Sequence, residues 1–303
     1  MSGQVKNLSV IIVNYNTGRY VLECIDSLLL QEDVNLEIIV VDNASRDNSV
    51  DLITEKFGSE VKLIRSPKNV GFGQANNLAA SVAKSEFLLV LNPDTTIPDT
   101  KALFNLIVFL ETHPKVGMVG PVIEEPRKGK RVLPRLTYPS SRHLKYTQTF
   151  KKLPGSIAWI LGACMLFRRE LYQSISGFDP DYFLYGEDAD ICLRVRKKGY
   201  EIGYCEDVLI KHVSAASEIG ADSFDKWLRK RRGVFLFITK HFDRRDAIHF
   251  SKISILKSRC YLIGLKIKAL LGVEATDLLE QKHRLDATVV VAQEVLANYK
   301  SSQ

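Results

Sequence analysis

The sequence lacks hydrophobic segments of the kind that place a chain in a membrane. No stretch of its 303 residues approaches the roughly 18 consecutive apolar residues that a membrane-spanning helix needs. The opening sequence MSGQVKNLSVIIVNYN holds only the short apolar block LSVIIV, which is typical of a strand and too short for a secretory signal. We therefore expect neither an export signal nor a membrane span.

Cysteine is scarce, and the cysteines are dispersed. The five thiols form no Cys-x-x-Cys pair, which argues against a zinc site or a redox motif built on that spacing. An odd, scattered set in a chain without an export signal predicts reduced thiols and a cytoplasmic location. The residues are Cys24, Cys164, Cys192, Cys205 and Cys260.

Several common catalytic and nucleotide-binding motifs are also missing. The first predicted strand leads into NYNTGRY and not into a glycine-rich turn, and NVGFGQAN departs from Gly-x-Gly-x-x-Gly at Asn76. Neither the phosphate-binding loop GxxxxGK[ST] nor the nucleophile turn GxSxG occurs. These absences argue against dinucleotide oxidoreductases, P-loop kinases and α/β-hydrolases.

The charge is concentrated in one segment. The chain carries a net +7, but residues 225–268 hold thirteen Lys or Arg against three Asp, so the remainder is slightly acidic. An acidic main domain argues against a nucleic-acid-binding protein. The basic segment has three interpretations: a solvated helix face, a contact to a diphosphate, or an amphipathic anchor on the anionic inner face of the cell membrane.

Strand and helix signals alternate through the first 123 residues. Short apolar blocks predict strands, and the segments between them show helical spacing, as at Val21, Ile25, Leu28 and Leu29. Strands separated by helices favour parallel pairing with right-handed crossovers, so the fold class is α/β. The predicted strands cover residues 8–13, 36–41, 61–65, 87–92 and 116–123.

The alternation ends near residue 124. Residues 124–155 are rich in Pro, Ser and basic residues and predict a mobile loop, while the pattern from 222 onward is helical and amphipathic. In the segment FDKWLRKRRGVFLFITKHF we expect Trp227, Val234, Phe235 and Ile238 to face inward. We expect two domains, an α/β domain over residues 1–221 and a basic helical extension over 222–303.

Four polar clusters follow predicted strands or open a predicted helix. They are Asp42-Asn43, Asp94, Glu187-Asp188 and His212. Ligands of open α/β sheets bind outside the carboxyl ends of the strands, so these clusters can meet at one edge.

Asp94 and His212 are candidates for a divalent-metal site. A carboxylate and an imidazole with open water positions suit such an ion. The alternatives are a turn-forming Asp in LNPDT and a histidine that is satisfied in the core or lies on the surface.

The other two clusters also have two interpretations each. Asp42 could accept a hydrogen bond from a nucleotide or cap the next helix, although Ser45, Asp47 and Asn48 are better placed to cap. In one interpretation, Glu187 and Asp188 do no more than cap a helix. In the other, the crowding of carboxylates in YGEDAD raises the pKa of one of them, as a general base requires.

Six blocks together resemble glycosyltransferase family 2, most closely its bacterial rhamnosyltransferase-like branch. They appear in order between residues 7 and 215: VIIVNYN, VVDNASRDNS, NVGFGQANN, LNPDT, GACMLFRRE and GFDPDYFLYGEDADICLRVRKKGY. The resemblance implies a GT-A fold, with a mostly parallel central sheet flanked by helices. It also implies an inverting, metal-dependent transferase that uses a nucleotide-sugar donor with Mg²⁺ or Mn²⁺.

The resemblance further implies roles for individual residues. Asp188 matches the catalytic base, with Glu187 beside it, and Asp94 matches the last position of an Asp-x-Asp metal motif whose first position is here Asn92. His212 matches a third metal contact of some members. Donor-binding positions are Asn14, Asp42, Asn43, Asn69, Gly71 and Asn92.

The sequence thus predicts an inverting hexosyltransferase that acts in cell-surface polysaccharide synthesis. The favoured donor is dTDP-rhamnose, and the acceptor is a saccharide or a lipid-linked saccharide. A transferase for a UDP- or GDP-linked sugar, and a non-catalytic nucleotide- or sugar-binding protein, are the alternatives. The sequence assigns no oligomeric state.

Overall fold

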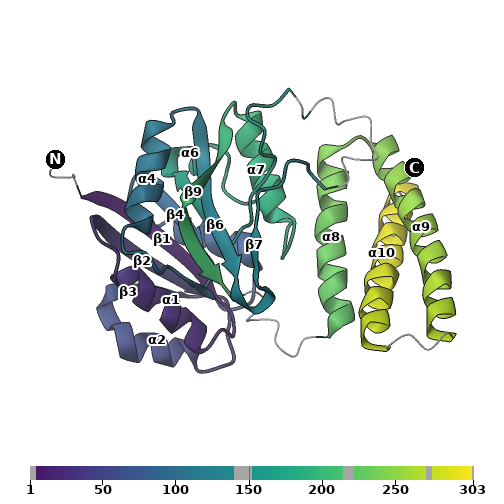
Figure 1. Ribbon diagram of the computed structural model, residues 1–303, viewed down its shortest axis with the longest axis horizontal. Helices are drawn as coiled ribbons and strands as arrows, with labels where there is room; N and C mark the ends of the chain where they lie inside the picture. Colours follow the sequence, from purple (N-terminus) through teal and green to yellow (C-terminus); the bar gives the residue numbers. More distant parts are fainter. Residues whose placement is uncertain (1–4, 140–149, 151, 214–221, 271–274, 302–303) are drawn as a thin grey trace. The chain divides into compact units, whose positions relative to one another are not determined.

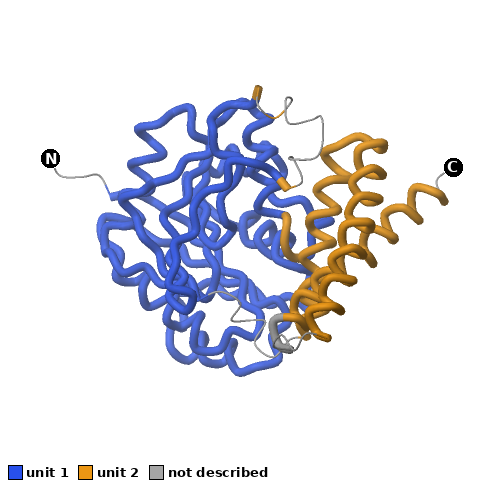
Figure 2. The backbone as a smooth tube through the Cα atoms, turned by 45° about the vertical axis from the view of Figure 1, so that its right-hand side comes forward, with its two compact units in different colours: residues 1–138, 153–183, 187–219 blue, residues 139–152, 184–186, 220–303 orange. Residues whose placement is uncertain are grey.

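The computed structural model describes residues 5–139, 150, 152–213, 222–270 and 275–301, and the side chains of 275–277 are not described. The chain forms two compact units (Figure 2). Unit 1 comprises residues 1–138, 153–183 and 187–219, and unit 2 comprises residues 139–152, 184–186 and 220–303. The division into domains at residues 221 and 222 stays a prediction.

Unit 1 is built on one nine-stranded sheet with the order β3-β2-β1-β4-β8-β6-β9-β5, and β7 pairs with β6 (Figure 1). Pairing is parallel through β3, β2, β1 and β4 and between β6 and β9, whereas β8, β5 and β7 pair antiparallel. The strands are β1 (Lys6–Asn14), β2 (Val34–Asp42), β3 (Val61–Arg65), β4 (Phe87–Leu91), β5 (Thr95–Thr96), β6 (Val116–Glu125), β7 (Lys130–Val132), β8 (Cys164–Arg168) and β9 (Glu201–His212).

The helices of unit 1 connect these strands, as the alternating pattern predicts. They are α1 (Arg19–Leu29), α2 (Ser49–Phe57), α3 (Phe72–Ala80), α4 (Ala102–Thr112), α6 (Arg169–Ser174) and α7 (Glu187–Lys197). In α1, Val21, Ile25 and Leu28 are fully buried, but Leu29 is exposed and does not belong to the inner stripe.

The sheet has a hydrophobic core on each face. Leu8, Val10 and Ile12 of β1 pack in one core, and Ile11 and Val13 pack in the other. Alternate residues of a strand point to opposite faces, so a strand that is buried on both sides is apolar throughout. This explains why the strand signals are continuous apolar blocks.

One sequence prediction about the middle of the chain needs correction. The segment from residue 124 is not simply a loop, because β6 continues to Glu125 and β7 pairs back onto it; residues 140–149 lie outside the described part. The sheet is also mixed. Strand β8 runs antiparallel to both of its neighbours in the sheet, β4 and β6.

Unit 2 contains three long helices, α8 (Ser223–His241), α9 (Arg244–Leu270) and α10 (Ala275–Ser301). Phe235 and Ile238 are buried as predicted, while Trp227 and Val234 are only partly buried. Phe235 packs with Val291 and Ala292 of α10. None of the helices among the described residues is both long and apolar enough to cross a bilayer.

Candidate active site

The carboxyl ends of β2, β1 and β4 place the first predicted residues along one edge of the sheet. Asn14 pairs in register with Asp42, and Ile12 of β1 pairs with Leu91, the last residue of β4. Because β1 lies between β2 and β4, the ends of these two strands are about 10 Å apart. Asp42 and Asn92 therefore lie at the same edge.

Asp42 is buried within a network of polar side chains. Its Oδ1 accepts a hydrogen bond from Asn14 Nδ2 at 2.9 Å, and its Oδ2 accepts one from the Ser45 backbone N–H at 3.2 Å. Asn14 Nδ2 also approaches Ser49 Oγ at 2.8 Å. Asp42 is thus fixed by its neighbours, and the Ser49 N–H at the start of α2 is bound by Asp47. Both observations fit the prediction that Asp42 is not needed to cap α2.

Asn43, Asn69 and Gly71 hold one loop together. Asn43 Nδ2 donates to Asn69 Oδ1 at 3.0 Å and to the Gly71 carbonyl at 3.3 Å, and the Gly71 N–H donates to Asn69 Oδ1 at 2.9 Å. Gly71 has φ +85°, and a Cβ there would lie 2.5 Å from the Phe183 carbonyl oxygen. The amides and the glycine therefore shape the loop itself, whatever contacts they make with a donor.

Asn92, Asp94 and His212 form the second cluster. His212 Nε2 lies 3.2 Å from Asp94 Oδ1 and 3.3 Å from Asn92 Nδ2, and all three come together because β5 pairs Thr95 with His212. Asp94 and His212 are each 7% exposed. The His212 Nδ1 atom is buried without a hydrogen-bond partner among the described residues.

This donor set fits a divalent ion that also binds a substrate. Carboxylate oxygen and imidazole nitrogen are suitable ligands, and Mg²⁺ is commonly held by one or two carboxylates together with substrate phosphates. The described residues contain no group of three or more His, Cys, Asp or Glu side chains placed to hold a metal. Asp94 and His212 would supply two protein ligands to such an ion, and its other positions would be open to phosphate oxygens.

The step Gly162–Ala163 joins this cluster to Asp188. The Asn92 N–H donates to the Ala163 carbonyl at 2.9 Å. A Cβ at Gly162 would lie 3.4 Å from the Asp188 Cβ, and the Gly162 backbone also hydrogen-bonds the Asp188 carboxylate. Asn92 and Asp188 thus contact neighbouring residues of the segment that leads into β8.

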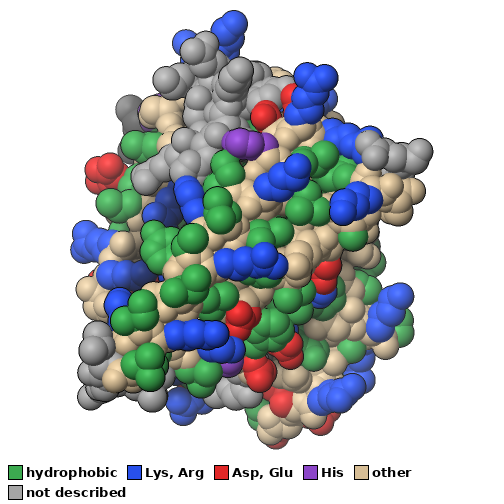
Figure 3. All heavy atoms as spheres, turned by 90° about the vertical axis from the view of Figure 1, so that its right-hand side faces the viewer, with side chains coloured by type: hydrophobic (Ala, Val, Ile, Leu, Met, Phe, Trp, Pro, Cys, Tyr) green, Lys and Arg blue, Asp and Glu red, His purple; other side chains and the backbone are tan. Residues whose placement is uncertain are grey.

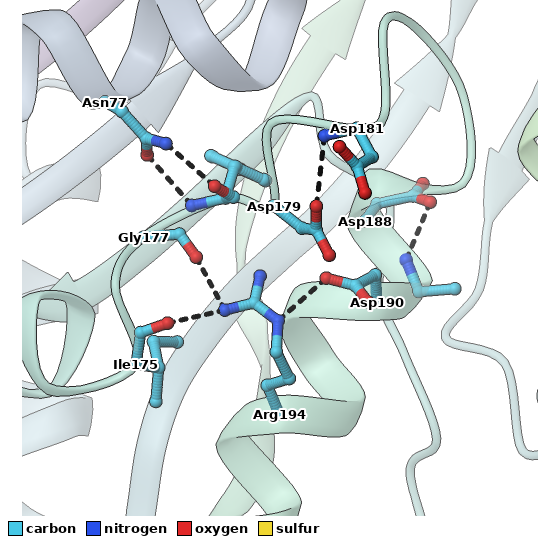
Figure 4. Close-up of polar contacts among 10 residues, drawn as sticks. Asn77, Ile175, Gly177, Asp179, Asp181, Asp188, Asp190 and Arg194 are labelled. Atoms are coloured by element: carbon cyan, nitrogen blue, oxygen red, sulfur yellow. Dashed lines mark hydrogen bonds and ion pairs between the residues drawn. The ribbon is translucent and has the colours of Figure 1, made fainter. Parts of the chain in front are cut away.

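The three acids that open α7 differ in charge state. Asp190 is fully buried and its carboxylate binds Arg194 Nε at 2.8 Å, so its charge is neutralised (Figure 4). Burial, together with the charge of Asp188, raises the pKa of Glu187 to about 8, and its Oε2 has no partner among the described residues. Glu187 is therefore protonated at neutral pH.

Asp188 is the acid of this group that remains ionised at neutral pH and forms no ion pair with any residue that the structure describes. It is partly exposed, and its carboxylate accepts a hydrogen bond from the Ala189 N–H at 2.8 Å. Burial raises its pKa to about 6, and hydrogen bonds from Ala189 and Gly162 limit the rise. A carboxylate with a pKa near neutrality suits a general base.

The sequence prediction missed Arg135. Its charge lowers the pKa of Asp188, and its guanidinium lies 5.9 Å from the centre of the Trp159 ring. The backbones of Arg135 and Trp159 form an isolated antiparallel bridge. Arg135 belongs to the segment predicted as a mobile loop, and only the tertiary structure brings it near Asp188.

The comparison with protein families identifies the chain. Residues 9–176 match the family Glycosyl transferase family 2, and residues 142–215 match the family described as the N-terminal domain of galactosyltransferase. Among curated proteins, the chain is 24% identical over 266 residues to an N-acetylglucosaminyl-diphospho-decaprenol L-rhamnosyltransferase of Mycobacterium tuberculosis, covering 76% of this chain and 83% of that protein. It is also 24% identical over 210 residues to an O-antigen chain rhamnosyltransferase of Salmonella typhimurium, covering 68% and 66% of the two chains.

Solved structures show the same fold. A mannosyltransferase of Pyrobaculum calidifontis, in complex with GDP-Man and Mn²⁺, superimposes with a TM-score of 0.56 at 19% identity over 98% of this chain and 75% of that one. The S. aureus protein TarS superimposes with a TM-score of 0.53 at 17% identity over 98% and 92%. The predicted GT-A fold and family are confirmed, and the chain belongs to glycosyl transferase family 2.

Proposed function

We propose that this glycosyltransferase moves a sugar, with inversion, from a nucleotide-diphosphate donor to a saccharide or lipid-linked acceptor during cell-surface polysaccharide synthesis. dTDP-rhamnose is the favoured donor, since the two relatives named above are rhamnosyltransferases. A UDP- or GDP-linked sugar is the alternative donor.

One observation carries the catalytic part of the proposal. Asp188 is a partly exposed carboxylate with a pKa of about 6, and Gly162–Ala163 connects it to the Asn92–Asp94–His212 cluster. A transferase needs a base on one side of the sugar and a cation on the diphosphate side. Asp188 would be the base, the Asn92–Asp94–His212 cluster would hold the cation, and both lie in unit 1.

The reaction follows as a single displacement. Asp188 accepts the proton of the acceptor hydroxyl as its oxygen forms the bond to the anomeric carbon. The bond from that carbon to the donor diphosphate breaks at the same time, and its electron pair leaves with the phosphate oxygen. Asp42 holds the nucleoside through its carboxylate, which Asn14 and Ser45 keep in place.

Asp94 and His212 would hold the divalent ion, either Mg²⁺ or Mn²⁺. The bound ion supplies positive charge that stabilises the departing diphosphate. Asn92 replaces a carboxylate of the usual motif, so the protein contributes less negative charge to this ion.

Replacing the base tests the mechanism. We expect Asp188→Asn to lower kcat by about 10²–10⁴-fold, because it removes the proton acceptor, while the dissociation constant of the donor stays within about twofold. Donor binding is measured by calorimetry and turnover by release of nucleoside diphosphate. Asp181→Asn, at an exposed acid in the preceding loop, is the matched control and keeps full turnover. Unchanged turnover in Asp188→Asn would show that Asp188 is not the base.

Nucleotide binding tests the donor and the metal. We expect dTDP with Mn²⁺ to raise the melting temperature more than UDP or GDP with Mn²⁺, because the favoured donor carries thymidine. EDTA should remove the metal-dependent part of the shift and Asp94→Asn should weaken it, since a neutral carboxamide attracts a divalent cation less strongly than a carboxylate does. No response to any nucleoside diphosphate would contradict the donor assignment and leave a different ligand class for this edge of the sheet.

We also propose that the basic helices of residues 225–268 bind an anionic membrane surface. Their thirteen cations and three acids give an excess of positive charge. Such segments are attracted to anionic lipids, which would bring the enzyme to a lipid-linked acceptor.

A further inference from the structure

Unit 2 contains a pocket that the catalytic proposal does not use. It has a volume of about 420 Å³ and is formed by side chains of α8, α9 and α10. This volume lies in the range of sites that hold small ligands. The pocket lining includes four cations and no acid, namely Arg231, Lys257, Lys268 and Arg284.

Two of these cations, Arg231 and Arg284, lie near the same aromatic ring. The guanidinium groups of Arg231 and Arg284 lie 5.4 Å and 5.9 Å from the centre of the same ring, that of Trp227. Burial and the charge of Arg284 lower the pKa of Arg231. The Arg231 Nε is buried without a hydrogen-bond partner among the described residues.

No acidic side chain in the described parts of α8, α9 and α10 pairs with any of the four cations. Arg232 pairs with Glu294 and Lys282 pairs with Asp286, but neither of these two cations lines the pocket. The attraction of an indole ring stabilises a cation but does not neutralise it. Clustered, uncompensated guanidinium groups are therefore expected to bind an anion.

The remaining polar lining selects the kind of anion. Ser254 and Ser258 contribute hydroxyl groups to the pocket, whereas the hydroxyl of Thr288, which also lines it, already donates to the Arg284 carbonyl. Guanidinium groups bind phosphate through pairs of N–H donors, and hydroxyls donate to its remaining oxygens. A phosphate group satisfies this mixed lining better than a single carboxylate, because it presents more acceptor oxygens.

An exposed apolar stripe runs along α9, the helix that supplies Lys257 and Lys268. Leu256, Ile263, Ile267 and Leu270 follow helical spacing, and all are more than half exposed, Leu270 at 86%. Figure 3, which faces the α9 side of Figure 1, shows hydrophobic and basic side chains interleaved over this face, with fewer acidic ones. An exposed apolar row along a basic helix can enter the outer part of a lipid layer.

We propose that the pocket binds the phosphate head group of a membrane lipid while the apolar stripe of α9 enters the lipid layer. Arg231 and Arg284 contact the phosphate, Lys257 and Lys268 stand beside it, and the hydroxyls complete the site. This inference does not depend on the transfer reaction, because the pocket lies in unit 2 and the proposed donor-binding and catalytic residues lie in unit 1.

Two substitutions on α9 that remove the same charge test the proposal in the full-length protein. Lys268→Gln alters the pocket lining, whereas Lys266→Gln alters another exposed lysine, two residues away, that does not line it. Binding is measured by co-sedimentation with phosphatidylcholine vesicles containing phosphatidic acid, and by calorimetry with pyrophosphate. We expect Lys268→Gln to weaken both at least fivefold and Lys266→Gln to change them less than twofold. Arg284→Gln should weaken both at least tenfold.

Equal losses in the two lysine variants would overturn the proposal, because they would indicate general attraction between a basic surface and an anion. Pyrophosphate binding that depends on Lys268, with vesicle binding that does not, would also overturn it, since the ligand would then be a soluble phosphate. A melting-temperature shift by dTDP and Mn²⁺, measured in each variant, reports on the donor site separately. Its loss would indicate a failure of folding or of the proposed function, not of the pocket.

Discussion

Individual side chains at the start of α7 determine which acid can act as a base. Three carboxylates in four residues would repel one another if all were ionised. The structure resolves this by pairing Asp190 with Arg194 and by keeping Glu187 protonated through burial. Asp188 is left to ionise close to neutral pH.

The pH dependence of turnover follows from the raised pKa of Asp188. Its folded value of about 6 lies above the usual 3.8, so the carboxylate proposed as the base is ionised above about pH 6 and becomes protonated as the pH falls. We expect kcat to fall about tenfold per pH unit below this value, because only the ionised carboxylate accepts the proton. A rate profile from pH 4.5 to 8 measures this. A constant rate down to pH 4.5 would exclude a base with a raised pKa.

At the scale of elements, the turn before α7 positions the site through backbone contacts. Arg194 donates to the carbonyls of Ile175 and Gly177 at 2.7 Å (Figure 4). The side chain of Asn77 in α3 donates to the Phe178 carbonyl and accepts a hydrogen bond from the Phe178 N–H. Gly177 has φ +61°, and a Cβ there would meet the Asn77 Oδ1 and, at 2.7 Å, the Tyr172 Cε1. The turn therefore requires glycine for both conformation and space.

Replacing this glycine should destabilise the protein. We expect Gly177→Ala to lower the free energy of unfolding by about 2–5 kcal/mol, from the left-handed conformation and the clash together. Gly129→Ala is the control, because Gly129 has a similar φ of +56° with no atom within 4 Å of the added carbon. It should cost only about 1–2 kcal/mol. Urea denaturation measures the free energy of unfolding of both variants. Equal losses would show that the clash with Asn77 and Tyr172 does not contribute to the destabilisation.

At the scale of the whole molecule, the two units differ in the sign of the charge that they carry. The proposed donor and catalytic residues of unit 1 include the acids Asp42, Asp94 and Asp188, while α8 and α9 of unit 2 carry most of the excess positive charge. This division of charge fits the two proposals made above, a metal-dependent donor site in unit 1 and attachment of unit 2 to an anionic surface.

Membrane binding should accordingly depend on salt. We expect co-sedimentation with vesicles rich in phosphatidylglycerol to weaken by at least tenfold between 50 mM and 500 mM NaCl, because salt screens exposed charges within about 10 Å or less. Vesicles of phosphatidylcholine alone serve as the control and should bind little at either salt concentration. Salt-independent binding to both vesicle types would contradict an electrostatic attachment.

The sequence by itself determined the alternation of strands and helices in the first part of unit 1 and the positions of the acids at the strand ends. Both can be found in the local sequence, because buried strands are apolar blocks and the turns that end them are polar. Apolar blocks marked β1, β2 and β4, and Asp42, Glu187 and His212 fell at the ends of elements as predicted. Six motifs in order then indicated the family, which the comparison confirmed.

Only the tertiary structure decided how these residues interact. The antiparallel direction of β8, the pairing that joins Asp94 to His212, the approach of Arg135 to Asp188 and the charge states of the acids in α7 all depend on contacts between residues far apart in the chain. A local pattern contains no information on such contacts, because desolvation and charge pairing are set by neighbours that folding brings together. The cationic pocket of unit 2 depends on three helices at once for the same reason.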